Sequence, residues 1–306
     1  MYYPYLRGRQ YELLALRESV KNESIISKNI IPILEPVRAS STLLSTLSEF
    51  INYKHNIVVI RNPNVGDFEV ELGLRNDFKE KYEELIKNPF INYAYILTSK
   101  KIDEIFAEVD TINDRNVFFI YDDSSVAEQI SKRMNKANIF SLVPDKSIFR
   151  RKLKNRIILE DCFNKQDRNA DYEKNIDEYF SENQLIYLDD DWSGFSDFSI
   201  VGDNYTESGF SPKVVAIHMV YFSNDNILRV HHFLSKNDDS IENIPGKFNE
   251  ALTELLSFPF FSEVNNKSFA LSQFDELKNQ EKFPGLGTVK KLSIMHHLEL
   301  MSNFLG

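Results

Sequence analysis

Short apolar runs recur along the first two thirds of the chain, and most of them are followed by an amphipathic stretch. Strand–helix alternation of this kind predicts a parallel sheet covered by helices. Eight such runs predict closure into an α/β, TIM-like barrel, whose active site lies at the carboxyl ends of the strands. The expected strands are YYPYL (2–6), IPIL (31–34), IVVI (57–60), YAYIL (93–97), VFFIY (117–121), IFSLV (139–143), RIIL (156–159) and FSIV (198–201).

The pattern becomes irregular in its second half, where a long insertion occupies residues 161–195. From residue 213 two β-type runs are joined by the polar turn SNDN, which predicts an antiparallel hairpin. Apolar residues at helical spacing predict three further helices, near 245–257, 268–280 and 288–304. We therefore expect a barrel over residues 1–212 and a hairpin with C-terminal helices over 213–306, packed together as one compact unit.

The composition is that of an ordinary globular protein: of 306 residues, 42% are hydrophobic and 27% are charged. The formal net charge of −10 argues against broad, non-specific nucleic-acid binding. The one cysteine, Cys162, excludes an internal disulfide and fits a reducing compartment. The N-terminal segment lacks the layout of a signal peptide and no apolar run is long enough to span a membrane, so we expect a cytoplasmic protein.

Several expected strands end in a charged residue that shares a face with the apolar residues before it. By the two-residue period of a strand, Glu35, Arg61 and Asp161 each continue such an apolar row. If these rows face the barrel interior, the charges meet at the barrel mouth, where sites of this fold are built.

The carboxylates at this mouth are the first candidates for chemistry. Glu35, Asp161 and Asp203 could bind a hard divalent cation such as Mg²⁺ or Mn²⁺, or two of them could serve as general acid and base. The arginines that could bind a phosphate in bidentate fashion are Arg7, Arg9, Arg61 and Arg168. The alternative is a network of arginine–carboxylate pairs that only fixes loops.

Two further segments carry candidate residues with alternative interpretations. In RNADY (168–172), Arg168 could contact a phosphate, whereas Asp171 is placed to cap an expected helix YEKNIDEYF. A four-residue hairpin turn places His218 directly opposite His231, a pair that could hold zinc if a third ligand came from elsewhere. Otherwise these imidazoles pack and form hydrogen bonds in the core.

No motif in the sequence defines a reaction. There is no GxSxG elbow, no P-loop and no GxGxxG after a strand. LRGR (6–9) is similar to the strand-end HRG of barrel phosphodiesterases, but Leu6 stands in place of the histidine. We interpret Cys162 as structural, because its acidic neighbours disfavour a thiolate. The aromatic residues around LDDDWSGFSDF could stack on a base or sugar, or could plug the insertion onto the barrel; they are Trp192, Phe195, Phe198 and Tyr205.

Segments along nearly the whole chain resemble one known family. The opening YYPYLRGRQYELLALRE and the following IPILEP are similar to the bacteriophage beta-protein family and a related group of uncharacterised bacterial proteins. The similarity continues in RNADY, FSDFSIVGDNYTESG, VVAIH and LGTVKKLSIMHHLE. The family has no settled activity, so the resemblance implies a phage-encoded or defence-island protein and supplies no functional residues.

Two functions follow from these observations. The first is a barrel-mouth hydrolase or phosphodiesterase that acts on a nucleotide or another phosphorylated substrate. The second is a non-catalytic recognition or scaffold component of a phage-defence system that binds a partner protein. Charges that converge on an open cavity favour the enzyme, and charges that pair off with each other favour the scaffold.

Overall fold

The computed structural model describes residues 1–22, 25–99, 102–133, 136–207, 212–236 and 240–306. The chain forms two compact units that alternate along the sequence. The first unit comprises Met1–Leu13, Ile30–Glu160 and Ile186–Asp197, and the second comprises Leu14–Asn29, Asp161–Leu185 and Phe198–Gly306. This division differs from the single boundary expected at residue 212.

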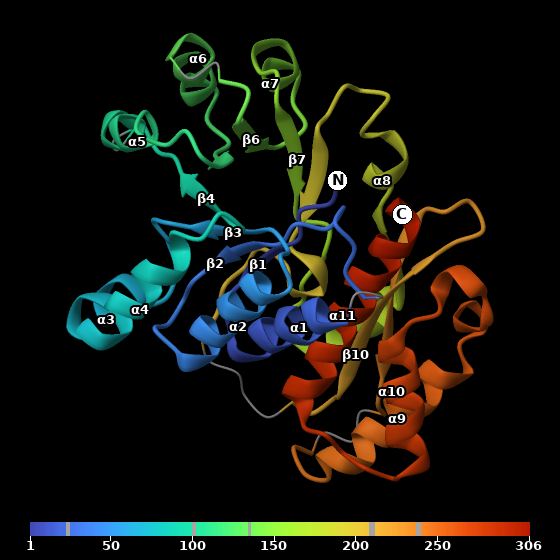
Figure 1. Cartoon of the computed structure of the whole chain (residues 1–306). Coiled ribbons are helices and arrows are strands. Elements are labelled where there is room, and N and C mark those ends of the chain that lie inside the picture. Colours follow the sequence, from blue (N-terminus) through green and yellow to red (C-terminus); the bar gives the residue numbers. More distant parts are fainter. Residues whose placement is uncertain (23–24, 100–101, 134–135, 208–211, 237–239) are drawn as a thin grey trace. The chain divides into compact units, whose positions relative to one another are not determined.

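The first unit is a parallel sheet of eight strands that curls into a nearly closed barrel (Figure 1). Its strands follow one another in chain order: β1 (Tyr5–Arg7), β2 (Ile33–Glu35), β3 (Ile57–Ile60), β4 (Ile91–Ile96), β5 (Val117–Ile120), β6 (Ile139–Val143), β7 (Arg156–Glu160) and β9 (Gly194–Asp197). The Tyr3 amide donates to the Phe195 carbonyl over 2.9 Å, which links the segment before β1 to β9. The expected α/β barrel is confirmed.

The eighth strand is not the expected FSIV run. Residues 199–201 form a short 3-10 helix, η2 (Ser199–Val201), and the strand is GFSD immediately before it. The reason is space, because a Cβ added at Gly194 would lie 2.7 Å from the Tyr3 ring. Ser196 also donates its hydroxyl proton to the Tyr3 carbonyl over 2.6 Å. Small residues at positions 194 and 196 therefore fit where this strand meets Tyr3.

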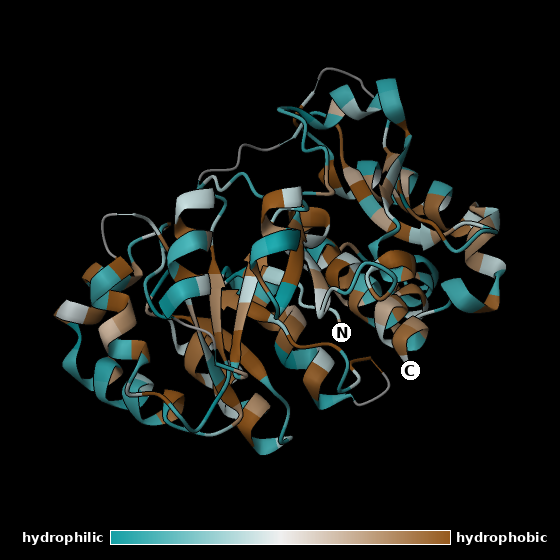
Figure 2. Cartoon of the chain, turned by 90° about the horizontal axis from the view of Figure 1, so that it is seen from above, coloured by the Kyte–Doolittle hydropathy of each residue, from teal (hydrophilic) through white to brown (hydrophobic). Residues whose placement is uncertain are grey.

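Helices cover the outside of this sheet, and the two-residue period separates inner from outer side chains. On β5, Phe118 packs against Tyr3 and Phe140, while the next residue, Phe119, packs against Phe106 of a covering helix. Figure 2 shows helices that are apolar on one side and polar on the other. The helices are α2 (Ser41–Asn52), α3 (Phe68–Leu74), α4 (Asn76–Ile86), α5 (Ile102–Val109), α6 (Ser124–Arg133) and α7 (Ser147–Lys152); α1 (Gln10–Lys21) begins in the first unit and ends in the second.

The second unit contains an antiparallel sheet in the order β10–β11–β8. The expected hairpin is confirmed as β10 (Ala216–Phe222) and β11 (Leu228–Leu234), and β8 (Asp177–Ser181) adds a third strand. The three expected C-terminal helices are confirmed as α9 (Ile244–Ser257), α10 (Phe269–Asn279) and α11 (Leu286–Leu305). The remaining short helices are α8 (Asn183–Ile186), which crosses from the second unit into the first, and the 3-10 helices η1 (Asn169–Asn175), η3 (Pro259–Ser262) and η4 (Val264–Asn266).

Two local expectations in this unit are wrong. The expected helix YEKNIDEYF does not form, because its second half pairs with β11 as β8, and Asp171 caps nothing and accepts hydrogen bonds from Arg168. In the hairpin, five residues and not four connect the strands, since Phe222 pairs with Leu228. That one-residue shift places His218 opposite His232 and leaves His231 opposite Met219, on the other face of the sheet.

The described part of the chain contains no helix that is both long and apolar enough to cross a membrane.

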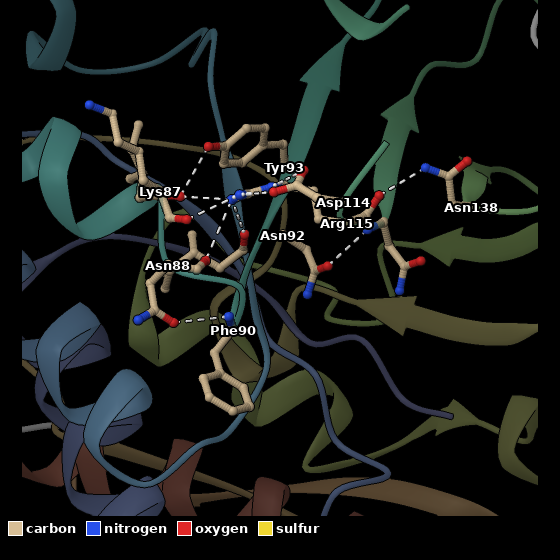
Figure 3. Close-up of polar contacts among 11 residues, drawn as sticks. Lys87, Asn88, Phe90, Asn92, Tyr93, Asp114, Arg115 and Asn138 are labelled. Carbon is tan, nitrogen blue, oxygen red and sulfur yellow. Dashed lines mark hydrogen bonds and ion pairs between the residues drawn. The ribbon is translucent and has the colours of Figure 1, made fainter. Parts of the chain in front are cut away.

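Arg115 fastens the amino-terminal rim of the barrel (Figure 3). Its guanidinium donates to the carbonyls of Ile86, Lys87 and Ile91 at 2.9–3.1 Å and lies 4.5 Å from the centre of the Tyr93 ring. Two of these carbonyls belong to the end of α4, where helical carbonyls lack donors from the helix itself. Because the side chain is only 6% exposed, we interpret Arg115 as a structural clamp between α4, β4 and β5.

Replacing Arg115 should therefore destabilise the barrel. We expect Arg115→Ala to lower the free energy of unfolding by about 2–4 kcal/mol, because the carbonyls of Ile86, Lys87 and Ile91 all lose a donor. Urea denaturation followed by circular dichroism measures the change. The control is Arg133→Ala, whose side chain is 49% exposed in an ion pair with Asp103, and which should change stability by less than about 0.5 kcal/mol. Equal effects of the two variants would contradict the clamp.

Candidate functional site

The barrel rim brings Arg7 and Glu35 together at the ends of β1 and β2. The Tyr5 hydroxyl donates to Glu35 Oε2 over 2.7 Å, and Arg7 Nε lies 3.4 Å from the same oxygen. The other oxygen, Oε1, accepts the Asn64 backbone N–H over 2.8 Å. Glu35 is 1% exposed, so its carboxylate joins β1 to the loop after β3 and both of its oxygens are occupied.

Arg61 and Arg9 were also expected at the barrel rim of the first unit, but neither forms an ion pair with Glu35 of the kind that Arg7 forms. Arg61 lies on the outer face of β3, with Nη2 3.7 Å from Glu83 of α4 and its guanidinium 5.3 Å from the centre of the Tyr93 ring. The expectation that its row faces the barrel interior is therefore wrong, because that row packs under α4. Arg9 lies between β1 and α1, where its carbonyl accepts the Leu13 N–H over 2.9 Å.

The remaining expected site residues belong to the second unit. Asp161 and Asp203 come together, but through a loop contact: Asp161 Oδ2 accepts the Asp203 backbone N–H over 2.9 Å. Arg168 is exposed and pairs with Asp171. The expected trio of Glu35, Asp161 and Asp203 is thus divided between the two units. Over the described ranges, no three His, Cys, Asp or Glu side chains gather in a way that could hold a metal ion.

His218 and His232 form a buried hydrogen-bonded pair, Nδ1 to Nδ1 at 2.7 Å. The rings of Phe163 and Tyr172 lie against them. Burial, with a smaller contribution from nearby positive charge, lowers the pKa of His232 to about 4 and that of His218 well below its usual value. Both rings are neutral near pH 7, so the interpretation of these histidines as packed core residues is supported and the expected His218–His231 metal pair is wrong.

The aromatic residues around LDDDWSGFSDF are not exposed. Trp192, Phe195 and Phe198 are buried and Tyr205 is half-buried. Within the first unit the Arg156 guanidinium lies over the Trp192 ring, 5.0 Å from the centre of the ring. These rings contribute to packing and not to an open stacking surface.

The other face of the antiparallel sheet carries a polar cluster that the sequence did not predict. Asp177 on β8 accepts hydrogen bonds from three side chains of the same sheet: Arg229 and His231 on the neighbouring β11, and Tyr221 on β10, beyond it. The distances are 2.9 Å from the Tyr221 hydroxyl, 2.6 Å from Arg229 Nε and 2.9 Å from His231 Nδ1. We call these four residues the Asp177 cluster.

Electrostatics fixes the protonation of this cluster. Burial alone would raise the pKa of Asp177, but the hydrogen bonds from His231, Tyr221 and Arg229 outweigh it and lower the pKa. Burial and the same carboxylate raise the pKa of Tyr221 to about 12. Asp177 is therefore an ionised acceptor near neutral pH, so the proton between it and His231 must lie on His231 Nδ1.

The Asp177 cluster is accessible, unlike Glu35. The side chains of Asp177, Arg229 and His231 are 27%, 33% and 18% exposed. Among the described residues, none forms a hydrogen bond with His231 Nε2. Phe258 packs 4.4 Å from the His231 ring centre, and Phe260 packs 4.7 Å from that of Tyr221, which keeps water from one side. The arrangement presents an oriented imidazole and a guanidinium side chain that is one third exposed, the groups that proton transfer to or from an anionic substrate requires.

Part of this cluster was visible in the sequence. Arg229 and His231 lie two residues apart in an expected strand, so they share a face. The role of Asp177 was not predicted, because the spacing of charged and apolar residues around it predicts a helix. Burial along β8 does not alternate, since Phe180 and Ser181 are both buried, so the sequence carries no clear two-residue signal for this strand.

The Glu35 carboxylate, both of whose oxygens have partners, should contribute to the stability of the fold. We expect Glu35→Gln to lower the free energy of unfolding by about 3–5 kcal/mol, because it leaves buried partners of the carboxylate unpaired. Denaturation by urea measures the change, and the exposed Glu69→Gln on α3 is the control, with a change within about 0.5 kcal/mol. A Glu35→Gln protein of unchanged stability would contradict a structural role.

The buried histidines should make stability depend on pH. Their folded pKa values lie below 6.5, so the unfolded state binds more protons, and stability is fully present above pH 6.5 and falls as the pH drops towards 4. Each such histidine contributes a slope of at most about 1.4 kcal/mol per pH unit. We expect His232→Gln to make the measured slope shallower. A slope that is the same with and without His232 would contradict its burial as a neutral ring.

Comparison with models of protein families gave no match to this chain, and neither did comparison with curated proteins. The candidate site therefore stands on its own geometry.

Proposed function

We propose that this protein is a hydrolase that acts on a phosphorylated substrate by proton transfer at the Asp177 cluster. The observation that carries the proposal is the hydrogen bond from His231 Nδ1 to the ionised Asp177, which directs Nε2 of the same ring away from the carboxylate. The proposed chemistry lies in the second unit and not at the barrel mouth. The resemblance to the phage beta-protein family adds phage conflict as its proposed setting.

In the proposed reaction His231 is the general base and then the general acid. Nε2 accepts a proton as a water oxygen attacks phosphorus, and the bond from phosphorus to the leaving oxygen breaks. The imidazolium then returns this proton to the leaving oxygen. Asp177 keeps the ring in one tautomer and stabilises its positive charge, as the carboxylate of a Ser–His–Asp triad does. Arg229, a third of whose side chain is exposed, binds the phosphate oxygens.

Substitution of His231 tests the proposal. We expect the wild-type protein to hydrolyse bis(4-nitrophenyl) phosphate or 4-nitrophenyl phosphate, and His231→Gln to lower kcat/KM about 100-fold or more. Asp177→Asn should also lower kcat, because it no longer fixes the tautomer. The matched control is Glu178→Gln, the next carboxylate on β8 and on its opposite face, which should leave turnover unchanged. Absence of turnover by the wild type, or equal turnover by His231→Gln, would overturn the proposal.

A second candidate function is the non-catalytic recognition component that binds a partner protein. The observation that favours it is the pairing of the rim charges with each other: Glu35 with Arg7, Tyr5 and the Asn64 amide, and Arg61 with Glu83. In this function the barrel is a scaffold. A purified protein without turnover that retains a stoichiometric partner would favour it over the hydrolase.

A further inference from the structure

The segment from Lys132 to Lys154 carries a positive charge that the rest of the chain lacks. Its 23 residues include eight lysines and arginines and one carboxylate, that of Asp145, whereas the whole chain has 36 basic and 46 acidic side chains. The segment begins in the last turn of α6, includes β6 and α7, and ends before β7, all within the first unit. Seven of the eight cationic residues are exposed, and the eighth, Lys136, is half-buried. The net negative charge of the chain therefore does not extend to this surface.

The fold brings much of this charge together at the amino-terminal side of β6 and β7. The helices α6 and α7 pack side by side, and the last turn of each is basic (Figure 1). A hollow of about 100 Å³ at these helix ends is lined by Lys136 before β6, Lys152 of α7 and Lys154 before β7. Lys132 and Arg151 each lie next in sequence to a residue that lines this hollow. We call these five residues the basic patch.

Carboxylates neutralise only part of the basic patch. Two of its five members form ion pairs, at 3.2 Å and 3.9 Å, each with a carboxylate that is more than half exposed, and such pairs are weak. For Lys132, Arg151 and Lys154, no carboxylate of the described residues lies within ion-pair distance. A cation in the last turn of a helix also offsets the helix dipole, but Lys136 and Lys154 lie outside the helices. The patch therefore keeps positive charge that an anionic partner can neutralise.

We propose that the basic patch binds the phosphate backbone of a double-stranded nucleic acid without reading its sequence. Several exposed cations on one surface match a row of phosphates, each of which one lysine or arginine can contact. Among the described residues from 131 to 155, none is an exposed aromatic or other large apolar residue. The surface therefore lacks the side chains that stack on single-stranded bases or insert into a membrane. This inference concerns the first unit and does not depend on the proposed hydrolase activity.

Fluorescence anisotropy of the full chain with two short labelled duplexes, one of DNA and one of RNA, tests this proposal. We expect saturable binding at about 50 mM NaCl and a Kd that rises steeply with salt. The patch variant combines Lys132→Gln, Arg151→Gln and Lys154→Gln. It should weaken binding about tenfold or more, and it should lower the slope of log Kd against the logarithm of the NaCl concentration by about 2–3, because three phosphate contacts are lost.

The matched control removes the same charge from another surface of the first unit. It combines Lys79→Gln, Lys81→Gln and Lys87→Gln, three exposed lysines in or next to α4. Glutamates lie between these lysines in the sequence, so this surface has no comparable excess of positive charge. We expect the control variant to bind either duplex within about twofold of the wild type, because it leaves the phosphate contacts in place.

Four outcomes would overturn the proposal. They are the absence of saturable binding of either duplex by the wild type, equal affinity of the wild type and the patch variant, equal weakening by the control variant, and tighter binding to phosphatidylserine vesicles than to both duplexes. Tighter binding of one duplex would support the proposal and identify the partner as DNA or RNA. Thermal unfolding separates loss of the surface from loss of the fold: because all six replaced side chains are exposed, both variants should keep the native melting transition.

Discussion

Removal of the Glu35 and Asp177 carboxylates from water requires that donors from several elements meet their oxygens. The cost of removing a charge from water is several kcal/mol, and only hydrogen bonds and opposite charge offset it. Glu35 meets this condition with Tyr5, Arg7 and the Asn64 amide, and Asp177 meets it with Tyr221, Arg229 and His231. In both units, the polar residues that could do chemistry also hold neighbouring strands together.

The two carboxylates differ in what they leave accessible. Glu35 is almost completely buried and both of its oxygens accept hydrogen bonds. These bonds hold β1 and the loop after β3 in place at the barrel rim. Asp177 is partly exposed, and one of its donors is an imidazole whose second nitrogen is directed away from it. This difference, and not the charge itself, separates a structural ion pair from a candidate site for proton transfer. A charged strand end in a sequence cannot distinguish the two.

Strands with continuous apolar runs were predictable, and strands with small or charged residues were not. IVVI and VFFI lie in the barrel where their sequences indicate, because buried parallel strands are apolar on both faces. The strand at Gly194–Asp197 was missed, since its small residues are explained by Tyr3, almost two hundred positions away. The strand at Asp177–Ser181 was missed because pairing with β11 overrides a helical sequence pattern.

The site was harder to predict than the fold, because the period of two makes every assignment depend on register. A single extra residue in the hairpin connection moves His231 from beside His218 to the face of Asp177. The same alternation turns Arg61 towards α4 and away from the barrel interior. Residue types at strand ends indicated that polar contacts would form there, and only the register decides which partners they have.

The tautomer of His231 is the most direct test of this account. Long-range ¹H–¹⁵N correlation spectra of the imidazole rings, recorded at a pH where the His231 ring is neutral, distinguish a protonated Nδ1 from a protonated Nε2. We expect the Nδ1–H tautomer in the wild type, and its loss in Asp177→Asn. A wild-type spectrum with the proton on Nε2, or with both tautomers in rapid exchange, would contradict the claim that Asp177 orients this ring for proton transfer.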